Sequence, residues 1–255
     1  MAERRKGTLP VLETDGLSRS FGGLTAVRNV SIALHQGELQ AVIGPNGAGK
    51  STLVNLLSGE LKPSAGRVRL RGRDVAGEPA WRMTHLGIGR SFQRTNILAP
   101  LTVVENVRLA VQAMRAPVRH LLQPAVAQQA LVEQAEAVLA RVGLAGSGSH
   151  IAGTLSHGHQ RQLEIAMALA GSPSVLLLDE PMAGMGPEES ERITRLLKEL
   201  AHDHAVLLIE HDMDFVFAVA DWMTVMVDGA VLAEGTPPSI RANAAVQKAY
   251  LGGAA

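Results

Sequence analysis

Short apolar runs alternate with longer amphipathic stretches along this chain. Apolar runs of strand length predict β-strands at Val11–Glu13, Ala26–Leu34, Leu39–Ile43, Arg67–Leu70, Val175–Leu178 and Val206–Ile209. Helical spacing predicts α-helices at Ser51–Ser58, Val103–Met114, Val126–Val142, about Gly158–Ala170 and about Pro187–His202. A hairpin-like pair of strands is expected around Asp228 and Gly229. This alternation of strands and helices is typical of an α/β domain.

The stretch from about residue 95 to about residue 155 differs from the rest, because its pattern is mostly helical. The chain contains no internal repeat and no low-complexity segment that would divide it. We therefore expect one domain over residues 1–255, with a helical lobe at about 95–155 and a short C-terminal tail at about 236–255.

Composition narrows the classes of protein that fit. The 255 residues carry 24 Lys and Arg against 24 Asp and Glu, so the formal net charge is zero. A neutral chain with only seven aromatic residues is a poor candidate for binding nucleic acid, and no such partner is expected. The absence of cysteine excludes disulfides, thiolate zinc sites and cysteine nucleophiles. No apolar run approaches the roughly 18 residues of a membrane-spanning helix, and the basic N-terminus lacks the apolar stretch of a secretory signal.

A glycine-rich segment between a predicted strand and a predicted helix fits the pattern G-x-x-x-x-G-K-[ST]. Its glycines allow backbone N–H groups to surround phosphate oxygens, and the helix that follows directs its positive N-terminus at the anion. Lys50 is expected to reach the β- and γ-phosphates, and the Ser51 hydroxyl to bind Mg²⁺. The residues expected to contact the nucleotide are consecutive: Gly44, Pro45, Asn46, Gly47, Ala48, Gly49, Lys50, Ser51 and Thr52.

Two carboxylates end the apolar run Val175–Leu178, which is typical of a parallel strand buried on both faces. Ligands bind at the carboxyl ends of strands in α/β sheets. Asp179 is therefore expected to hold Mg²⁺, through a water molecule, and Glu180 to act as general base toward the attacking water. Taken alone, the same residues also fit a solvated acidic turn, but the phosphate-binding segment upstream favours the catalytic interpretation.

The segment Leu155-Ser-His-Gly-His159 resembles the LSGGQ signature of ATP-binding-cassette (ABC) ATPases, and the order of the three motifs is also that of the family. The resemblance implies an α/β P-loop ATPase core with an antiparallel β subdomain and an inserted helical lobe, with ATP and Mg²⁺ as cofactors. Ser156 and Gly158 match the residues that bind the γ-phosphate of ATP held by the opposite subunit. His157 and His159 depart from the family pattern, and their spacing leaves a metal site as a weak alternative.

Further positions match the family. Gln93 resembles the loop glutamine that contacts Mg²⁺ and water and connects to the helical lobe. His211 resembles the switch histidine that contacts the γ-phosphate and is expected to be catalytic, with Glu180 and Lys50. Phe21 resembles the aromatic residue that stacks on adenine. Gly186 stands where many relatives have Asp, in the loop that crosses the dimer interface.

A finer resemblance extends over most of the chain. Five segments are similar to the ATPase subunits of branched-chain amino-acid importers, a family that includes urea and short-chain amide importers: Leu17–Gly23, Gly87–Gln93, Leu163–Ala166, Asp179–Met185 and the tail from Glu234. The resemblance implies a peripheral protein on the cytoplasmic face of the inner membrane. Its partners would be a second ATPase subunit, identical or a sister, membrane permease subunits and, indirectly, an extracytoplasmic substrate-binding protein.

Alternatives to amino-acid import stay open at this stage. Lipopolysaccharide-export ATPases are similar in length and tail. A soluble ABC ATPase of DNA repair or translation fits less well, because this chain has a single cassette and no basic arm. A small-molecule kinase or GTPase would share the phosphate-binding segment but not the signature, nor His211 after a buried strand.

Overall fold

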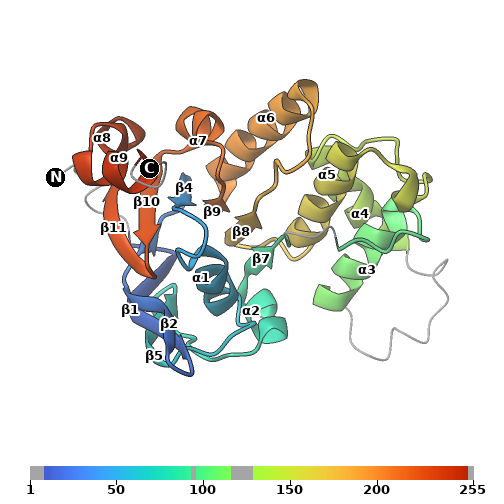
Figure 1. Cartoon of the computed structure of the whole chain (residues 1–255). Coiled ribbons are helices and arrows are strands. Elements are labelled where there is room, and N and C mark those ends of the chain that lie inside the picture. Colours follow the sequence, from blue (N-terminus) through green and yellow to red (C-terminus); the bar gives the residue numbers. More distant parts are fainter. Residues whose placement is uncertain (1–8, 93–95, 116–128, 252–255) are drawn as a thin grey trace.

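The computed structural model describes residues 9–92, 96–115 and 129–251, which form two β-sheets and a group of helices (Figure 1). One sheet is mostly parallel and lies at the centre of the molecule. The other is antiparallel and lies beside it, and the helices α3, α4 and α5 gather on the opposite side. None of the helices in the described ranges combines the length and the apolar character that a membrane crossing requires.

The central sheet has six strands in the order β11-β10-β4-β9-β8-β7. Their bounds are β4 Glu38–Ile43, β7 Ile88–Arg90, β8 Val175–Asp179, β9 Ala205–Ile209, β10 Trp222–Val227 and β11 Ala230–Gly235. All neighbours are parallel except β10 and β11, which form the hairpin expected at Asp228 and Gly229. Strands β4, β8 and β9 are buried along their whole length, as their continuous apolar runs predict.

The antiparallel sheet follows the order β2-β1-β5-β6, with β3 also paired to β1. Its strands are β1 Leu12–Phe21, β2 Leu24–Val30, β3 Ala33–Leu34, β5 Ala65–Leu70 and β6 Arg73–Asp74. The single strand predicted over Ala26–Leu34 is therefore two strands. The hydroxyl of Thr14 donates to the carbonyl of Val30 (2.9 Å) and accepts from the N–H of Ile32 (3.0 Å), so a buried side chain satisfies the backbone at the break.

Helices cover the central sheet on both sides. Helix α1 (Lys50–Leu57) lies between the two sheets and buries four of its eight residues there, Leu53, Val54, Leu56 and Leu57. Helices α2 (Ala80–Leu86), α6 (Pro187–Asp203) and α7 (Met213–Val219) pack around the sheet, and α8 (Pro237–Arg241) and α9 (Ala244–Leu251) follow β11. Helix α6 presents the apolar stripe of a surface helix to the core.

The helices α3 (Val103–Arg115), α4 (Gln129–Arg141) and α5 (His157–Leu169) share one apolar core with α6 and with the face of β8 and β9 that they cover. Val107 and Val111 of α3 meet Leu139 of α4 and Leu163 of α5 in this core, all four of them almost fully buried. Helix α5 therefore stands between the sheet and the two outer helices, and its first residues lie at the edge of this group.

Candidate functional site

The phosphate-binding loop leaves β4 and enters α1 along a path that only glycine permits at two positions. A Cβ atom on Gly44 would lie 2.1 Å from the carbonyl oxygen of Met226, and one on Gly49 would lie 2.3 Å from that of Ala26. Gly49 also has φ +94°, in the region that L side chains rarely adopt. The loop is therefore held tightly between β2 and β10 while its N–H groups precede a helix, which is the arrangement that binds phosphate.

Lys50 begins α1 and folds back over this loop. Its Nζ donates to the carbonyl oxygens of Gly44 (2.6 Å) and Pro45 (3.0 Å). Burial lowers the pKa of Lys50, and the charges of Glu180 and Asp179 oppose that shift. The ammonium is thus positioned over the loop with two carboxylates facing it. A phosphate group would offer it a charged acceptor in place of two neutral carbonyls.

Asp179 and Glu180 stand at the carboxyl end of β8. Asp179 is 3% exposed, and burial raises its pKa while Arg90 opposes that shift. Its Oδ1 is buried without a hydrogen-bond partner among the described residues. Glu180 has φ +48°, an unusual conformation for a residue with a side chain, and its N–H donates to the carbonyl oxygen of Ile209 (2.9 Å). Such a backbone costs of order 1 kcal/mol and is common at functional sites.

His211 follows the end of β9, which is the parallel neighbour of β8, and its side chain is 69% exposed. Its Nδ1 lies 3.8 Å from Oε1 of Glu180. The carboxyl ends of adjacent parallel strands lie at the same edge of the sheet. The structure thereby places Glu180 and His211 side by side, although they are 31 positions apart in the sequence. An imidazole and a carboxylate this close can act on the same water molecule and phosphate.

Glu210 is a further residue of this site, and the sequence analysis did not single it out. It is 1% exposed. Its Oε1 accepts the N–H of Met182 (3.0 Å) and its Oε2 accepts that of His211 (3.2 Å). Burial raises its pKa, and these two N–H groups oppose the shift. Glu210 thus ties the segment that follows Glu180 to the backbone of His211. A carboxylate directly after a fully apolar strand was the sequence signal that could have found it.

Ser156 and Gly158 lie at the start of α5. Ser156 is the N-cap, and its hydroxyl oxygen accepts the N–H of His159 (3.3 Å). The hydroxyl also donates to Oε1 of Glu189 (2.8 Å), and the same oxygen accepts the N–H of Gly158 (3.3 Å). The histidines that depart from the family pattern therefore leave the helix start intact. Within the described ranges, no group of three or more His, Cys, Asp or Glu side chains is placed to hold a metal ion.

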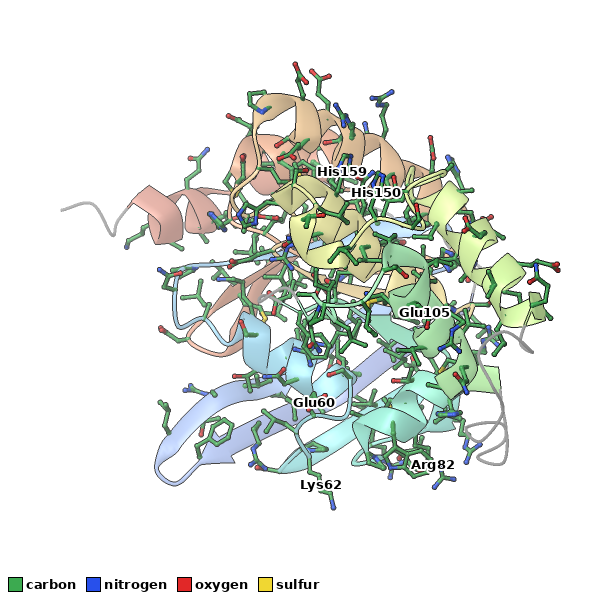
Figure 2. The ribbon with its side chains drawn as sticks, turned by 90° about the vertical axis from the view of Figure 1, so that its right-hand side faces the viewer. Glu60, Lys62, Arg82, Glu105, His150 and His159 are labelled. Carbon is green, nitrogen blue, oxygen red and sulfur yellow. The ribbon has the colours of Figure 1, made fainter. Side chains whose placement is uncertain are left out.

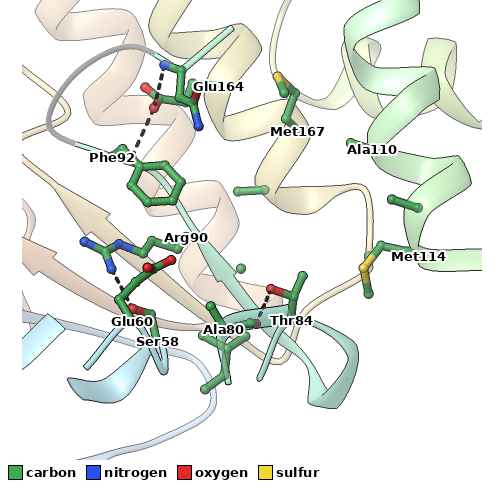
Figure 3. A pocket seen from close by; sticks show the side chains of 16 residues that line it. Ser58, Glu60, Ala80, Thr84, Arg90, Phe92, Ala110, Met114, Glu164 and Met167 are labelled. Carbon is green, nitrogen blue, oxygen red and sulfur yellow. Dashed lines mark hydrogen bonds between the residues drawn. The ribbon is translucent and has the colours of Figure 1, made fainter. Parts of the chain in front are cut away.

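Gln93 lies outside the described residues, but both flanks of its loop are in place. One carboxylate oxygen of Glu164, a buried residue of α5, accepts the N–H groups of Phe92 (3.1 Å) and Asn96 (3.4 Å). Arg161 donates to the other carboxylate oxygen (2.6 Å) and to the carbonyl of Phe92 (2.6 Å). The helix that starts with the signature therefore holds the two flanks of the Gln93 loop (Figure 3).

A pocket of about 240 Å³ opens beside this loop (Figure 3). Its walls come from the end of α1, from α2 and β7 on one side and from α3 and α5 on the other. Apolar side chains of the helices, Ala110, Met114 and Met167, form one wall. Arg90 lies on the opposite wall, where its guanidinium donates to the hydroxyl of Ser58 (2.5 Å). The guanidinium carbon lies 4.8 Å from the ring centre of Phe92.

Phe21 ends β1 at the turn into β2 and is 44% exposed. The guanidinium carbon of Arg19 lies 4.7 Å from its ring centre, so the ring already stacks against a cation. Strand β2, which pairs with Phe21 through Leu24, is also the strand whose Ala26 contacts Gly49. The aromatic residue therefore belongs to the hairpin that borders the phosphate-binding loop.

The loop, the acidic strand end and the parallel sheet define a P-loop nucleotide hydrolase. Residues 27–183 match the ABC transporter family, and residues 230–255 match a family described as branched-chain amino acid ATP-binding cassette transporter. The chain belongs to the ABC transporter family, as an ATPase coupled to transport. The fold class and the family expected from the sequence are confirmed.

Relatives resemble the chain over nearly its whole length. The high-affinity branched-chain amino acid transport ATP-binding protein LivG of Salmonella typhimurium is 41% identical over 250 residues, covering 95% of this chain and 98% of LivG. BraF of Pseudomonas aeruginosa, which has the same description, is 39% identical, with 95% and 98% covered. A nucleotide-free cassette from an ABC transporter superposes with a TM-score of 0.85 at 31% identity, covering 95% of this chain and 99% of that one. A dimeric bacterial cassette has a TM-score of 0.76 at 26% identity, with 89% and 98% covered.

Proposed function

We propose that this chain hydrolyses ATP to power the import of branched-chain amino acids through a membrane permease. The observation that carries the catalytic assignment is the approach of Glu180 and His211 to 3.8 Å at the strand ends that face Lys50. The choice of cargo is supported by the match of residues 230–255 and by the descriptions of LivG and BraF.

The proposed chemistry follows from the placement of the charged groups. The N–H groups of the loop and Lys50 bind the β- and γ-phosphates, and Phe21 stacks on the adenine. Glu180 orients a water molecule and accepts its proton as the water oxygen bonds to the γ-phosphorus. The bond to the leaving oxygen of ADP breaks, and ADP and phosphate are released. His211 can donate to a γ-phosphate oxygen while the Glu210 contact holds its backbone.

The residues present fit a Mg²⁺ ion. The buried Oδ1 of Asp179 has no partner within the described structure, and carboxylate and hydroxyl oxygens are the ligands that Mg²⁺ prefers. Asp179, through a water molecule, and Ser51 would hold the ion, with Gln93 from outside the described residues. When bound, Mg²⁺ would neutralise charge on the phosphate oxygens.

We infer that two such subunits enclose two ATP molecules head to tail, each loop facing the signature of the other. Ser156 and Gly158 would donate to the γ-phosphate bound by the partner, and the start of α5 would add its positive dipole. The partner subunit is a second copy or a sister ATPase. A related cassette whose solved structure is dimeric supports this arrangement.

The pocket beside Phe92 is where we expect a permease segment to dock, which would hold the chain peripherally at the cytoplasmic face of the inner membrane. Its wall of Ala110, Met114 and Met167 suits an apolar side chain, and Arg90 and Glu60 at the opposite wall suit a polar one. Glu164 lines the same pocket and holds the Gln93 loop, so docking and the ATP site share a residue. An extracytoplasmic binding protein would deliver the cargo without touching this chain.

Uptake by source cells tests the cargo. We expect cells carrying Glu180→Gln to lose uptake of labelled leucine while uptake of labelled urea is unchanged. Glu188→Gln removes the same charge from an exposed side chain and should leave the uptake of leucine and of urea unaffected. Loss of urea uptake alone would make the chain a urea or amide importer subunit. Unchanged uptake of both, with ATP hydrolysis intact in the purified wild-type complex, would contradict import and favour export.

A further inference from the structure

A carboxylate of the chain itself lies over the signature. Glu189 is the third residue of α6, and its Oε1 accepts both the hydroxyl of Ser156 (2.8 Å) and the N–H of Gly158 (3.3 Å). The two groups are so close that a Cβ atom on Gly158 would lie 2.6 Å from the carboxyl carbon of Glu189. His159, the next residue of α5, lies on the upper part of the face seen in Figure 2.

The contact is that of an anion at a helix N-terminus. The bond from the Ser156 hydroxyl holds the pKa of Glu189 below its usual range, and the Gly158 N–H and His159 act in the same direction. Glu189 is therefore ionised at neutral pH, and its charge interacts favourably with the dipole of α5. It satisfies the two donors that the proposed function gives to the γ-phosphate of the partner's ATP.

The same donors cannot serve both anions. A serine hydroxyl has one hydrogen to donate, and so does a backbone N–H. A carboxylate left within contact distance of a phosphate would also repel it. We propose that Glu189 is a resident anion on the signature that the γ-phosphate must displace, so that this residue sets the ATP concentration at which the two subunits close. This inference rests on the proposed ATP sandwich.

The displaced carboxylate has another partner at hand. Glu189 occupies the third position of α6, and the backbone N–H of Gly186, the N-cap of that helix, helps to lower its pKa. A glutamate at this position that returns to the N-cap N–H forms half of a capping box. Gly186 belongs to the loop that is expected to cross the dimer interface. Release of the signature would therefore strengthen the contact of Glu189 with that loop.

Subunit closure can be measured in a background that does not hydrolyse ATP. Glu180→Gln, Glu180→Gln with Glu189→Gln, and Glu180→Gln with Glu188→Gln are titrated with Mg-ATP, and the dimer fraction is followed by light scattering. Glu188 is the matched control, because it is adjacent, exposed and paired only weakly with Arg192 at 3.8 Å. We expect Glu189→Gln to lower the ATP concentration at half-dimerisation about fivefold, as for the loss of one exposed charged contact. Binding of a fluorescent ATP analogue to the monomer should be equal in all three.

Two results would overturn the role of Glu189. A higher half-dimerisation concentration would mean that the carboxylate positions Ser156 for the phosphate. A value equal to that of the Glu188→Gln control would mean that the contact is neutral. Both are distinct from failure of the proposed function, in which the Glu180→Gln parent itself stays monomeric with ATP and the role of Glu189 falls with the sandwich.

Discussion

The proposed hydrolysis depends on a few charged side chains of the site, and the role of Glu180 is the simplest to test. Its carboxylate is the only group of the site proposed to accept the proton of the attacking water. Glu180→Gln keeps the shape and removes that basicity, so we expect the turnover rate to fall by at least about 100-fold. Binding of a fluorescent ATP analogue should be unchanged, since Lys50 and the loop are untouched. Hydrolysis near the wild-type rate would exclude Glu180 as the base.

Glu210 acts through its neighbours, and its test needs a different readout. Glu210→Gln replaces one of two acceptor oxygens by an N–H donor, which cannot receive the N–H of Met182 or of His211. We expect kcat for ATP to fall about tenfold with KM within about twofold, because the loss of one such bond affects the base and the histidine rather than the phosphate loop. Equal losses in kcat and in ATP binding would mean a general structural role, and Glu210→Asp should restore part of kcat.

His204 makes stability depend on pH. Its Nδ1 lies 2.7 Å from the carbonyl oxygen of Pro173, and its Nε2 is buried with no hydrogen-bond partner in the described structure. Burial lowers its pKa and Arg141 adds to this, while the Pro173 carbonyl and Asp203 oppose it. The folded pKa lies below the unfolded value of about 6.5, so the unfolded state binds the proton more readily. The stability that His204 contributes is therefore fully present above about pH 6.5 and is lost as pH falls from there through its folded pKa.

Chemical denaturation between pH 7.5 and pH 5 checks this. We expect the free energy of unfolding of the wild type to fall over that range, and His204→Gln to show a smaller fall. His202→Gln, an exposed histidine on α6, serves as the control and should behave as the wild type. An equal pH dependence in His204→Gln would assign the effect to other groups.

Helices and strands show which parts of this fold a sequence determines locally. Each long amphipathic or fully apolar stretch became the predicted element, because burial of one face or of a whole strand imposes the pattern. The short elements α2, β6, β7, α8 and α9 were missed, since a few residues carry too little periodicity and their neighbours decide their conformation. The strand predicted at Val11–Glu13 covers only the start of β1, which extends to Phe21. The break between β2 and β3 was missed for the same kind of reason, because it depends on Thr14 of another strand.

The residues of the candidate site likewise fall into those that the sequence predicts and those that it does not. Lys50 and Glu180 lie in motifs that are continuous in the sequence and could be predicted from it. The contacts of Glu210, Glu164 and Glu189 join elements that are distant in the sequence, so a single chain pattern cannot indicate them. Their residue types were visible, but their partners were not.

Glu164 of helix α5 joins this helix to the flanks of the Gln93 loop, and the strength of that connection can be measured. Glu164 pairs with Arg161 in the interior and accepts the N–H groups on both flanks of the Gln93 loop. Removing one partner of a buried ion pair costs about 3–5 kcal/mol, so we expect Glu164→Gln to lower the free energy of unfolding by about that much. Glu188→Gln breaks the exposed pair with Arg192 on α6 and should cost about 1 kcal/mol or less. Urea denaturation compares the two, and equal losses would mean that Glu164 contributes no more than an exposed pair.

In the proposed dimer, each ATP site combines the phosphate loop of one subunit with the signature of the other. A mixture of two variants, each inactive alone, can test this arrangement. Ser156→Arg damages the signature and leaves the phosphate loop, while Glu180→Gln damages the base and leaves the signature. A mixed dimer then has one site with an intact Glu180 from the first variant and an intact Ser156 from the second. If the chain dimerises with itself, an equal mixture gives about half mixed dimers, each with one complete site out of two, and so about a quarter of wild-type hydrolysis.

The control uses the same substitutions on one chain. Ser156→Arg with Glu180→Gln, mixed with Glu180→Gln alone, leaves no site with a base and should stay inactive. Co-purification through an affinity tag carried by only one of the two variants establishes that mixed dimers have formed before the rates are compared. Mixed dimers that form and hydrolyse no ATP would contradict a site shared between subunits. Activity restored to about a quarter requires that Glu180 of one chain and the signature of the other act on the same ATP, because no single chain in the mixture carries both Glu180 and Ser156.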